Sequence, residues 1–281
     1  MTSTVFAMVL SAALLHAIWN ALVKVHGDRL VVMAMITVSA GIISVFALPF
    51  VAFPAPAAWP YIWGSLILHN AYYLFLVMAY RYGDLSHVYP LARGSAPLIV
   101  AGLSVALVGE SLTRQGFLSV GIISLGIMSL TLTRGASGFR EPRAVLFALG
   151  TGCFIALYTV VDGLGARLAG SAHGYTFWLF AIDTIPLAVF VVWLRRGKVL
   201  REVRHSWKVG LLAGVTSLVA VWLVIWALTL APLALVSALR ESGIVFAVLF
   251  GVIFLKERLD LIRLAATTTT LVGAVMLKTS K

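Results

Sequence analysis

Ten long apolar segments, separated by short polar breaks, constrain the fold of this chain more than any other feature. They cover roughly residues 4–23, 31–52, 59–80, 86–108, 115–133, 144–166, 173–194, 207–229, 233–255 and 260–278. Each is close to the roughly 20 residues that an α-helix needs to cross a bilayer. Helices satisfy their own backbone hydrogen bonds in lipid, and the alternating pattern of a membrane β-barrel is missing. The sequence therefore predicts an all-α polytopic membrane protein with ten transmembrane helices.

The composition leads to the same fold class. Of the 281 residues, 61% are hydrophobic and 11% are charged, and the mean hydropathy is +1.03. A soluble domain is about half apolar and about a quarter charged, so most of this surface must face lipid. The lone Cys153 excludes an internal disulfide and a cysteine-based metal cage. The first segment has no basic region before it and no cleavage signal, so we expect a retained span rather than a signal peptide.

Basic residues are distributed unevenly between the breaks. The net charge of +11 would suggest nucleic acid in a soluble protein, but here lysine and arginine lie mostly in short loops beside the lipid headgroups. The loops after odd-numbered segments hold 15 of them, whereas those after even-numbered segments and the C-terminus hold 4. Positive loops stay in the cytoplasm, so we predict odd-numbered loops inside and both termini outside. The longest polar loop is expected at 195–208.

An internal repeat divides the chain. Three pairs of polar residues are separated by the same 147 residues: Arg93 and Arg240, Ser95 and Ser242, and Glu110 and Glu257. We therefore predict two five-helix repeats, residues 1–137 and 138–281, in one integrated membrane domain, with their joint near 134–143. Because five is an odd number, the second repeat must be inverted relative to the first. Such repeats place a substrate site near the midplane, between the halves.

Two pairs of sequence segments carry a family resemblance. GESLTRQGFLSVGIISLGIMSL at 109–130 corresponds to KERLDLIRLAATTTTLVGAVML at 256–277, and LLHAIWNALVK at 14–24 corresponds to CFIALYTVVDG at 153–163. This pattern resembles the drug/metabolite transporter superfamily, specifically its ten-span EamA-type permeases, and is similar to bacterial amino-acid and metabolite exporters. The resemblance implies a secondary transporter in the bacterial cytoplasmic (inner) membrane. Arg93 and Arg240 are not general marks of that family.

The two arginines are the strongest candidates for a binding role. A charge in mid-span costs about 2.5–3.5 kcal/mol, and Tyr89 precedes Arg93 by four residues, on the same helix face. A guanidinium suits a carboxylate, phosphate or phosphonate. The alternative is structural, with Arg93 bonded to Glu241 or to carbonyls near its prolines. An Arg93–Glu241 contact would be either a pair that opens for substrate or proton, or a permanent clamp. Adjacent Arg240 and Glu241 should point about 100° apart and face different neighbours.

Other polar residues recur at helical spacing within the segments. Those that we assign to substrate binding, beside the arginines, are Tyr89, Ser242, His16, Trp19, Asn20, His69, Tyr73 and Tyr158. Those that we assign to proton coupling or ion pairing are Glu241, Asp183 and Asp162. Each also has a structural interpretation, because polar side chains in spans often serve helix packing. Glu110 and Glu257 lie at turns and are expected to fix helix ends.

The combined prediction is a secondary transporter, working as an exporter, of amino acids or related zwitterionic or anionic metabolites. It would work by alternating access and use protons as the coupling ion, as a monomer or a homodimer. No nucleotide motif, metal-ligand cluster or catalytic triad occurs, so no enzyme activity, cofactor or metal is predicted. Within transport the alternatives are a phosphonate or organic-acid permease and a cationic multidrug exporter. The alternative outside transport is an integral-membrane lipid-modifying enzyme.

Overall fold

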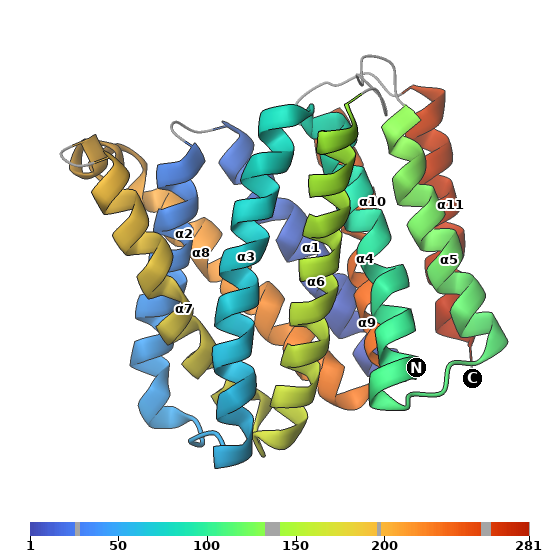
Figure 1. Ribbon diagram of the computed structural model, residues 1–281, viewed down its shortest axis with the longest axis horizontal. Helices are drawn as coiled ribbons and strands as arrows, with labels where there is room; N and C mark the ends of the chain where they lie inside the picture. Colours follow the sequence, from blue (N-terminus) through green and yellow to red (C-terminus); the bar gives the residue numbers. More distant parts are fainter. Residues whose placement is uncertain (26–28, 133–140, 196–197, 254–259, 281) are drawn as a thin grey trace.

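The computed structural model describes residues 1–25, 29–132, 141–195, 198–253 and 260–280. Within these ranges the chain forms helices and no strand, and the long helices lie side by side (Figure 1). Ten of the described helical segments are long and apolar enough to cross a membrane. The predicted fold class is therefore confirmed.

The long helices follow the predicted segments closely. They are α1 (Ser3–Val25), α2 (Arg29–Ala47), α3 (Trp59–Tyr82), α4 (Leu85–Val108), α5 (Arg114–Met128), α6 (Pro142–Leu168), α7 (Ala172–Arg195), α8 (Lys198–Leu230), α9 (Leu233–Arg240), α10 (Gly243–Ile253) and α11 (Leu261–Thr279). Three short 3₁₀ helices accompany them: η1 (Leu48–Phe50), η2 (Pro56–Ala58) and η3 (Ser129–Leu132). The predicted joint at 134–143 lies largely outside the described residues.

The helix of the eighth span begins well before the membrane-spanning part, where a loop was predicted. The polar segment 195–208 was predicted to be a loop, but α8 already begins at Lys198. No glycine or proline occurs between Lys198 and Lys208, so nothing in the chain stops the helix from extending beyond the apolar stretch. Polarity in this segment marks the end of the membrane-spanning part, not the end of the helix.

The ninth span is broken, which the sequence analysis did not expect. Helix α9 ends at Arg240 and α10 begins at Gly243. Between them the amide of Glu241 donates to the carbonyl of Ala238 (3.1 Å) and the amide of Ser242 donates to that of Leu239 (3.0 Å). These bonds reach back three residues instead of four, which tightens the turn. The break therefore lies at the charged pair.

The main helix contacts are symmetric between the two halves, while the division into two repeats stays a prediction. Helix α1 packs against α8 and α3 against α6, while α2 packs against α7 and α5 against α11. If each helix is replaced by its counterpart in the other half, the α1–α8 pair becomes the α6–α3 pair. The α2–α7 and α5–α11 pairs each stay the same. The hydroxyl of Thr184 donates to the carbonyl of Thr37 (2.8 Å), and these residues are separated by the same 147 positions. Gly126 packs closely on α11, and Gly273 packs closely on α5. Inversion of the second repeat stays a prediction.

The two ends of the described chain lie on one side of the helix bundle (Figure 1). The amino group of Met1 donates to the carbonyl of Ser280 at 3.4 Å. The loops after even-numbered spans share this side, which we call the terminal side. Helices α4, α6 and α8 end here.

A charged clasp joins three connections on the terminal side. Glu110 accepts from Nη2 of Arg167 (2.7 Å) and from the amide of Leu233 (2.8 Å). Arg167 also donates to the carbonyls of Leu228 (2.9 Å) and Ala231 (3.1 Å). Glu110 thereby fixes the start of α9, in the helix-end role expected from the sequence. Its predicted counterpart Glu257 lies outside the described residues.

Candidate functional site

A cavity of about 170 Å³ lies among helices of both halves. The predicted site residues that line it are His16, Trp19, Asn20, His69, Tyr73, Tyr89, Arg93, Tyr158, Asp162, Asp183 and Arg240. A smaller cavity of about 50 Å³ is lined by Glu241 and shares His16, Tyr89 and Arg93 with the larger one. Ser242 lines neither cavity; its hydroxyl is buried and has no polar partner in the described part of the chain. The fold thus gathers predicted site residues from six spans around one space.

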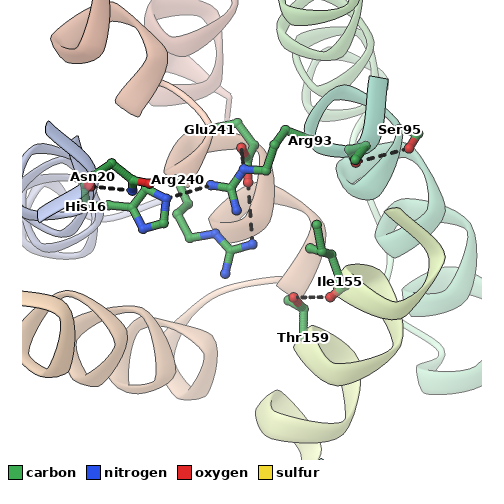
Figure 2. A network of polar contacts seen from close by, with 9 residues as sticks. His16, Asn20, Arg93, Ser95, Ile155, Thr159, Arg240 and Glu241 are labelled. Carbon is green, nitrogen blue, oxygen red and sulfur yellow. Dashed lines mark hydrogen bonds and ion pairs between the residues drawn. The ribbon is translucent and has the colours of Figure 1, made fainter. Parts of the chain in front are cut away.

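Two arginines share one carboxylate at the cavity wall, an arrangement that we call the arginine cluster (Figure 2). Nε of Arg93 lies 2.8 Å from Oε2 of Glu241, and Nη2 of Arg240 lies 3.4 Å from Oε1. Arg93 is 8% exposed and Glu241 is 4% exposed. The expectation that Arg240 and Glu241 face different neighbours is wrong. It assumed an unbroken helix, whereas the tight turn between α9 and α10 brings the two side chains together.

Helix α1 contributes a polar neighbour to the arginine cluster. Nε2 of His16 lies 3.3 Å from Nη2 of Arg93. A guanidinium can only donate, so this contact is a hydrogen bond when Nε2 carries no proton. Asn20 donates to the carbonyl of His16 (2.7 Å), and the Trp19 ring meets the imidazole edge-on with centroids 5.0 Å apart. Asn20 is thus held by its own helix, while His16 faces the cluster.

Helix α4 is adapted to hold Arg93 inside the bundle. Pro90 and Pro97 lie within the helix, and proline has no amide to donate to the carbonyl four residues earlier, which for Pro97 is that of Arg93. The Arg93 guanidinium lies 5.9 Å from the centroid of the Tyr89 ring. On the neighbouring α6, a Cβ at Gly152 would come within 2.8 Å of the carbonyl oxygen of Ala92. Only glycine lets α6 approach α4 this closely.

A second group of charged residues, the His69 cluster, lies on α3, α6 and α7. Nδ1 of His69 is 3.4 Å from Oδ2 of Asp183, and Nε2 is 3.9 Å from Oδ2 of Asp162. The hydroxyl of Tyr175 donates to Oδ1 of Asp162 (3.0 Å). The ring of Tyr158 meets the imidazole with centroids 4.5 Å apart. No group of three or more His, Cys, Asp or Glu side chains in the described ranges could hold a metal ion.

Part of the cavity lining was not predicted from the sequence. Tyr72 lines the cavity with its ring 6.0 Å from that of Tyr158, centroid to centroid. Thr37, Phe180 and Ser217 line it as well. Tyr72 was detectable as a neighbour of Tyr73. The other three lie in apolar segments that carry no distinguishing pattern, so only the packing of α2, α7 and α8 identifies them.

Comparisons with known proteins agree with this architecture. The model of the EamA-like transporter family matches residues 142–279. No curated protein matches the chain. One solved crystal structure superposes with a TM-score of 0.76 at 15% sequence identity, over 98% of this chain and 96% of the other. At that identity the likeness shows the fold alone.

The family match covers nearly the whole second predicted repeat, and the fold match covers the whole bundle. EamA is a family of transporters and not of enzymes. Residues 142–279 are therefore an EamA-like transporter domain within a multi-pass membrane protein.

Proposed function

We propose that this protein is a secondary transporter of a small zwitterionic or anionic metabolite, an amino acid or a related compound. The observation that carries the proposal is the arginine cluster at the cavity wall. Two guanidiniums lie in mid-span where a charge is costly: that of Arg93 is buried and the Arg240 side chain is 11% exposed. They share a single carboxylate, that of Glu241, so the cluster has an excess positive charge. A carboxylate from a substrate would neutralise it.

Glu241 occupies the place that a substrate carboxylate would take. Arg93 and Arg240 each contact one of its oxygens, and a guanidinium pairs with any carboxylate in the same fork geometry. In our proposal the substrate displaces Glu241 from one or both arginines. His16 and Tyr89 bound the anionic end of the site, while Trp19, Asn20, Tyr73 and Tyr158 shape the rest.

Translocation follows from the two-repeat arrangement. The halves would rock about the cavity and expose it to each side in turn. The excess of basic residues in the odd-numbered loops supports a cytoplasmic location for those loops and an outer location for the terminal side. We propose outward transport across a bacterial cytoplasmic membrane, with protons as the coupling ion. The protein would act as a monomer or a homodimer.

A second candidate is export of cationic drugs. It is favoured by Asp162 and Asp183, which line the same cavity beside the aromatic walls of Tyr72 and Tyr158. An aromatic organic cation would pack on those rings and pair with the carboxylates. An organic-acid or phosphonate permease is the other candidate, because the arginine cluster suits those anions equally well.

Ligand-dependent thermal stability of the purified protein separates these candidates. The compounds are L-alanine, L-phenylalanine, succinate, methylphosphonate and tetraphenylphosphonium, tested on wild type, Arg93→Ala and the control Arg143→Ala. Arg143 is an exposed arginine near the Tyr82 ring, outside the cavity. A compound present at about 100 times its Kd stabilises the folded state by about 2.7 kcal/mol.

We expect an amino acid or another anion to raise the melting temperature of wild type and Arg143→Ala, and Arg93→Ala to lose at least about tenfold in affinity, or about 1.4 kcal/mol. Stabilisation by tetraphenylphosphonium alone, equal in wild type and Arg93→Ala, would instead establish the cationic candidate and leave Arg93 a structural residue.

A further inference from the structure

The His69 cluster lies apart from the arginine cluster and has a different charge balance. Within the described residues, the ion pairs of Asp162 and Asp183 are both with His69. Oδ1 of Asp183 is buried and has no hydrogen-bond partner there. We propose that His69 is the binding site of the coupling proton, separate from the arginines that meet the substrate. This inference rests on the proposed transport function.

The geometry around the imidazole suits reversible protonation. Its two nitrogens face carboxylates on two different helices, Asp183 on α7 and Asp162 on α6. A protonated imidazole donates from both nitrogens, whereas a neutral one donates from only one. Only the protonated form can therefore bond both carboxylates at once. Histidine is also the side chain that ordinarily gains and loses a proton near neutral pH.

Neither contact is closed in this structure. The separations of 3.4 Å and 3.9 Å exceed the roughly 2.7–3.2 Å of a formed hydrogen bond. A small inward movement of α6 and α7 would close both when the imidazole is protonated. When the proton leaves, two buried carboxylates face each other with one donor between them and repel.

His69 lies where two helix pairs meet, so its protonation can control their spacing. Helix α3 packs most closely with α6, and α7 packs most closely with α2. The bond from Tyr175 to Asp162 also links α7 to α6. A proton on His69 would draw the two pairs together and its release would loosen them. Protonation of His69 would thus be a local change of charge that shifts the two helix pairs between a closer and a looser arrangement.

Other titratable groups border the same cavity and must be kept unchanged in any test. By element they are His16 on α1, Tyr72 and Tyr73 on α3, Tyr89 and Arg93 on α4, Tyr158 on α6, and Arg240 on α9. Tyr175 of α7 contacts Asp162. The two arginines are engaged by Glu241, which leaves His69 as the cation that faces the two aspartates.

Proteoliposome transport tests the proposal. Wild type, His69→Gln and the control His173→Gln are assayed with radiolabelled L-phenylalanine and succinate. His173 accepts from Nε1 of Trp222 (2.7 Å) and does not line the cavity. Two readouts are compared for each protein: exchange of solute at equal concentration and pH on both sides, and accumulation driven by an imposed pH gradient.

We expect the pH gradient to drive accumulation in wild type and His173→Gln. In His69→Gln, gradient-driven accumulation should fall at least tenfold more than equal-pH exchange does, relative to wild type. Asp183→Asn provides a second variant: it removes one carboxylate that attracts the proton, so its pH profile of gradient-driven transport should move to lower pH.

Four results would overturn the proposal. Gradient-driven accumulation that persists in His69→Gln would show that the coupling proton binds elsewhere. If His69→Gln fails to fold, an unchanged pH profile of transport in Asp183→Asn would show the same. Wild-type exchange without any response to a pH gradient would reject proton coupling but leave the proposed function intact. Absence of exchange for both compounds in wild type would reject the proposed function itself and, with it, this inference.

Discussion

Replacing Glu241 by alanine is expected to destabilise the protein by about 3–5 kcal/mol, because it leaves the buried guanidinium of Arg93 and the largely buried one of Arg240 without their carboxylate. Arg93 and Arg240 both contact Glu241, so the loss affects α4 and the α9–α10 turn together. The measurement is thermal unfolding of the detergent-purified protein. The matched control is Glu141→Ala, which removes an exposed carboxylate just before α6 and should leave the melting temperature nearly unchanged.

Added acetate should partly restore the stability of Glu241→Ala, because it supplies the missing carboxylate to the same two arginines. Sodium chloride at equal ionic strength should restore less, since a spherical anion cannot pair with both N–H groups of a guanidinium fork. The isosteric Glu241→Gln variant should bind carboxylate compounds at least about tenfold more tightly than wild type, because the internal competitor has lost its charge. Equal melting temperatures of Glu241→Ala and wild type would show that the ion pairs do not stabilise the folded protein.

Replacing Arg167 by alanine is expected to open the terminal side of the transporter and to destabilise it by about 1–2 kcal/mol. Arg167 donates to the carbonyls of Leu228 and Ala231 and to Glu110, and Glu110 in turn holds the amide of Leu233. The estimate is kept low because the Arg167 side chain is 30% exposed, and solvent weakens such pairs.

The readout for Arg167→Ala is solute exchange from each side of oriented proteoliposomes, together with the melting temperature. Loss of the clasp frees the start of α9, so the population open at the terminal side should grow and exchange from that side should accelerate. The control is Arg114→Ala, which removes an exposed arginine from the first turn of α5 on the same side. If Arg167→Ala and Arg114→Ala exchange solute from the terminal side at the same rate, the charged clasp has no gating role.

The membrane-spanning scaffold could be predicted from the sequence because hydropathy records each span directly. Nine of the ten segments appear as continuous spans near their expected limits, and Glu110 lies at a helix end as expected. The break at Glu241 was not predictable. No proline marks it, and the polar residues and glycine at 240–243 that interrupt the apolar run do not by themselves end a helix. The break depends on the charges of Arg93 and Arg240 collecting around one carboxylate, which is a tertiary effect.

Site residues could be predicted where a charged side chain is costly to place in a membrane span. They could not be predicted where the side chain is a hydroxyl, which is common in spans. Buried charges such as Arg93 and Asp183 stand out in an apolar segment because lipid cannot solvate them. Ser217 and Thr37 carry no such signal, since hydroxyls in spans commonly bond to their own helix, as Thr37 does to the carbonyl of Met33 (2.9 Å). The contact between His69 and two aspartates joins three helices, and no spacing within one helix could indicate it.

The central claim is that the substrate occupies the cavity beside Arg93, and site-directed labelling tests it most directly. Cys153 is the lone cysteine, so a Cys153→Ser background allows one thiol to be placed at will. Ser217→Cys puts it in the cavity lining. Thr216→Cys, the adjacent residue on α8, is the control because it does not line the cavity.

The measurement is the rate at which a membrane-impermeant methanethiosulfonate modifies each thiol, with and without the compound that stabilises wild type. We predict that saturating compound slows modification of Ser217→Cys at least tenfold and leaves Thr216→Cys unchanged, and that Arg93→Ala abolishes this protection. Modification of Ser217→Cys at the same rate with and without the stabilising compound would show that the compound binds elsewhere, and would contradict the account.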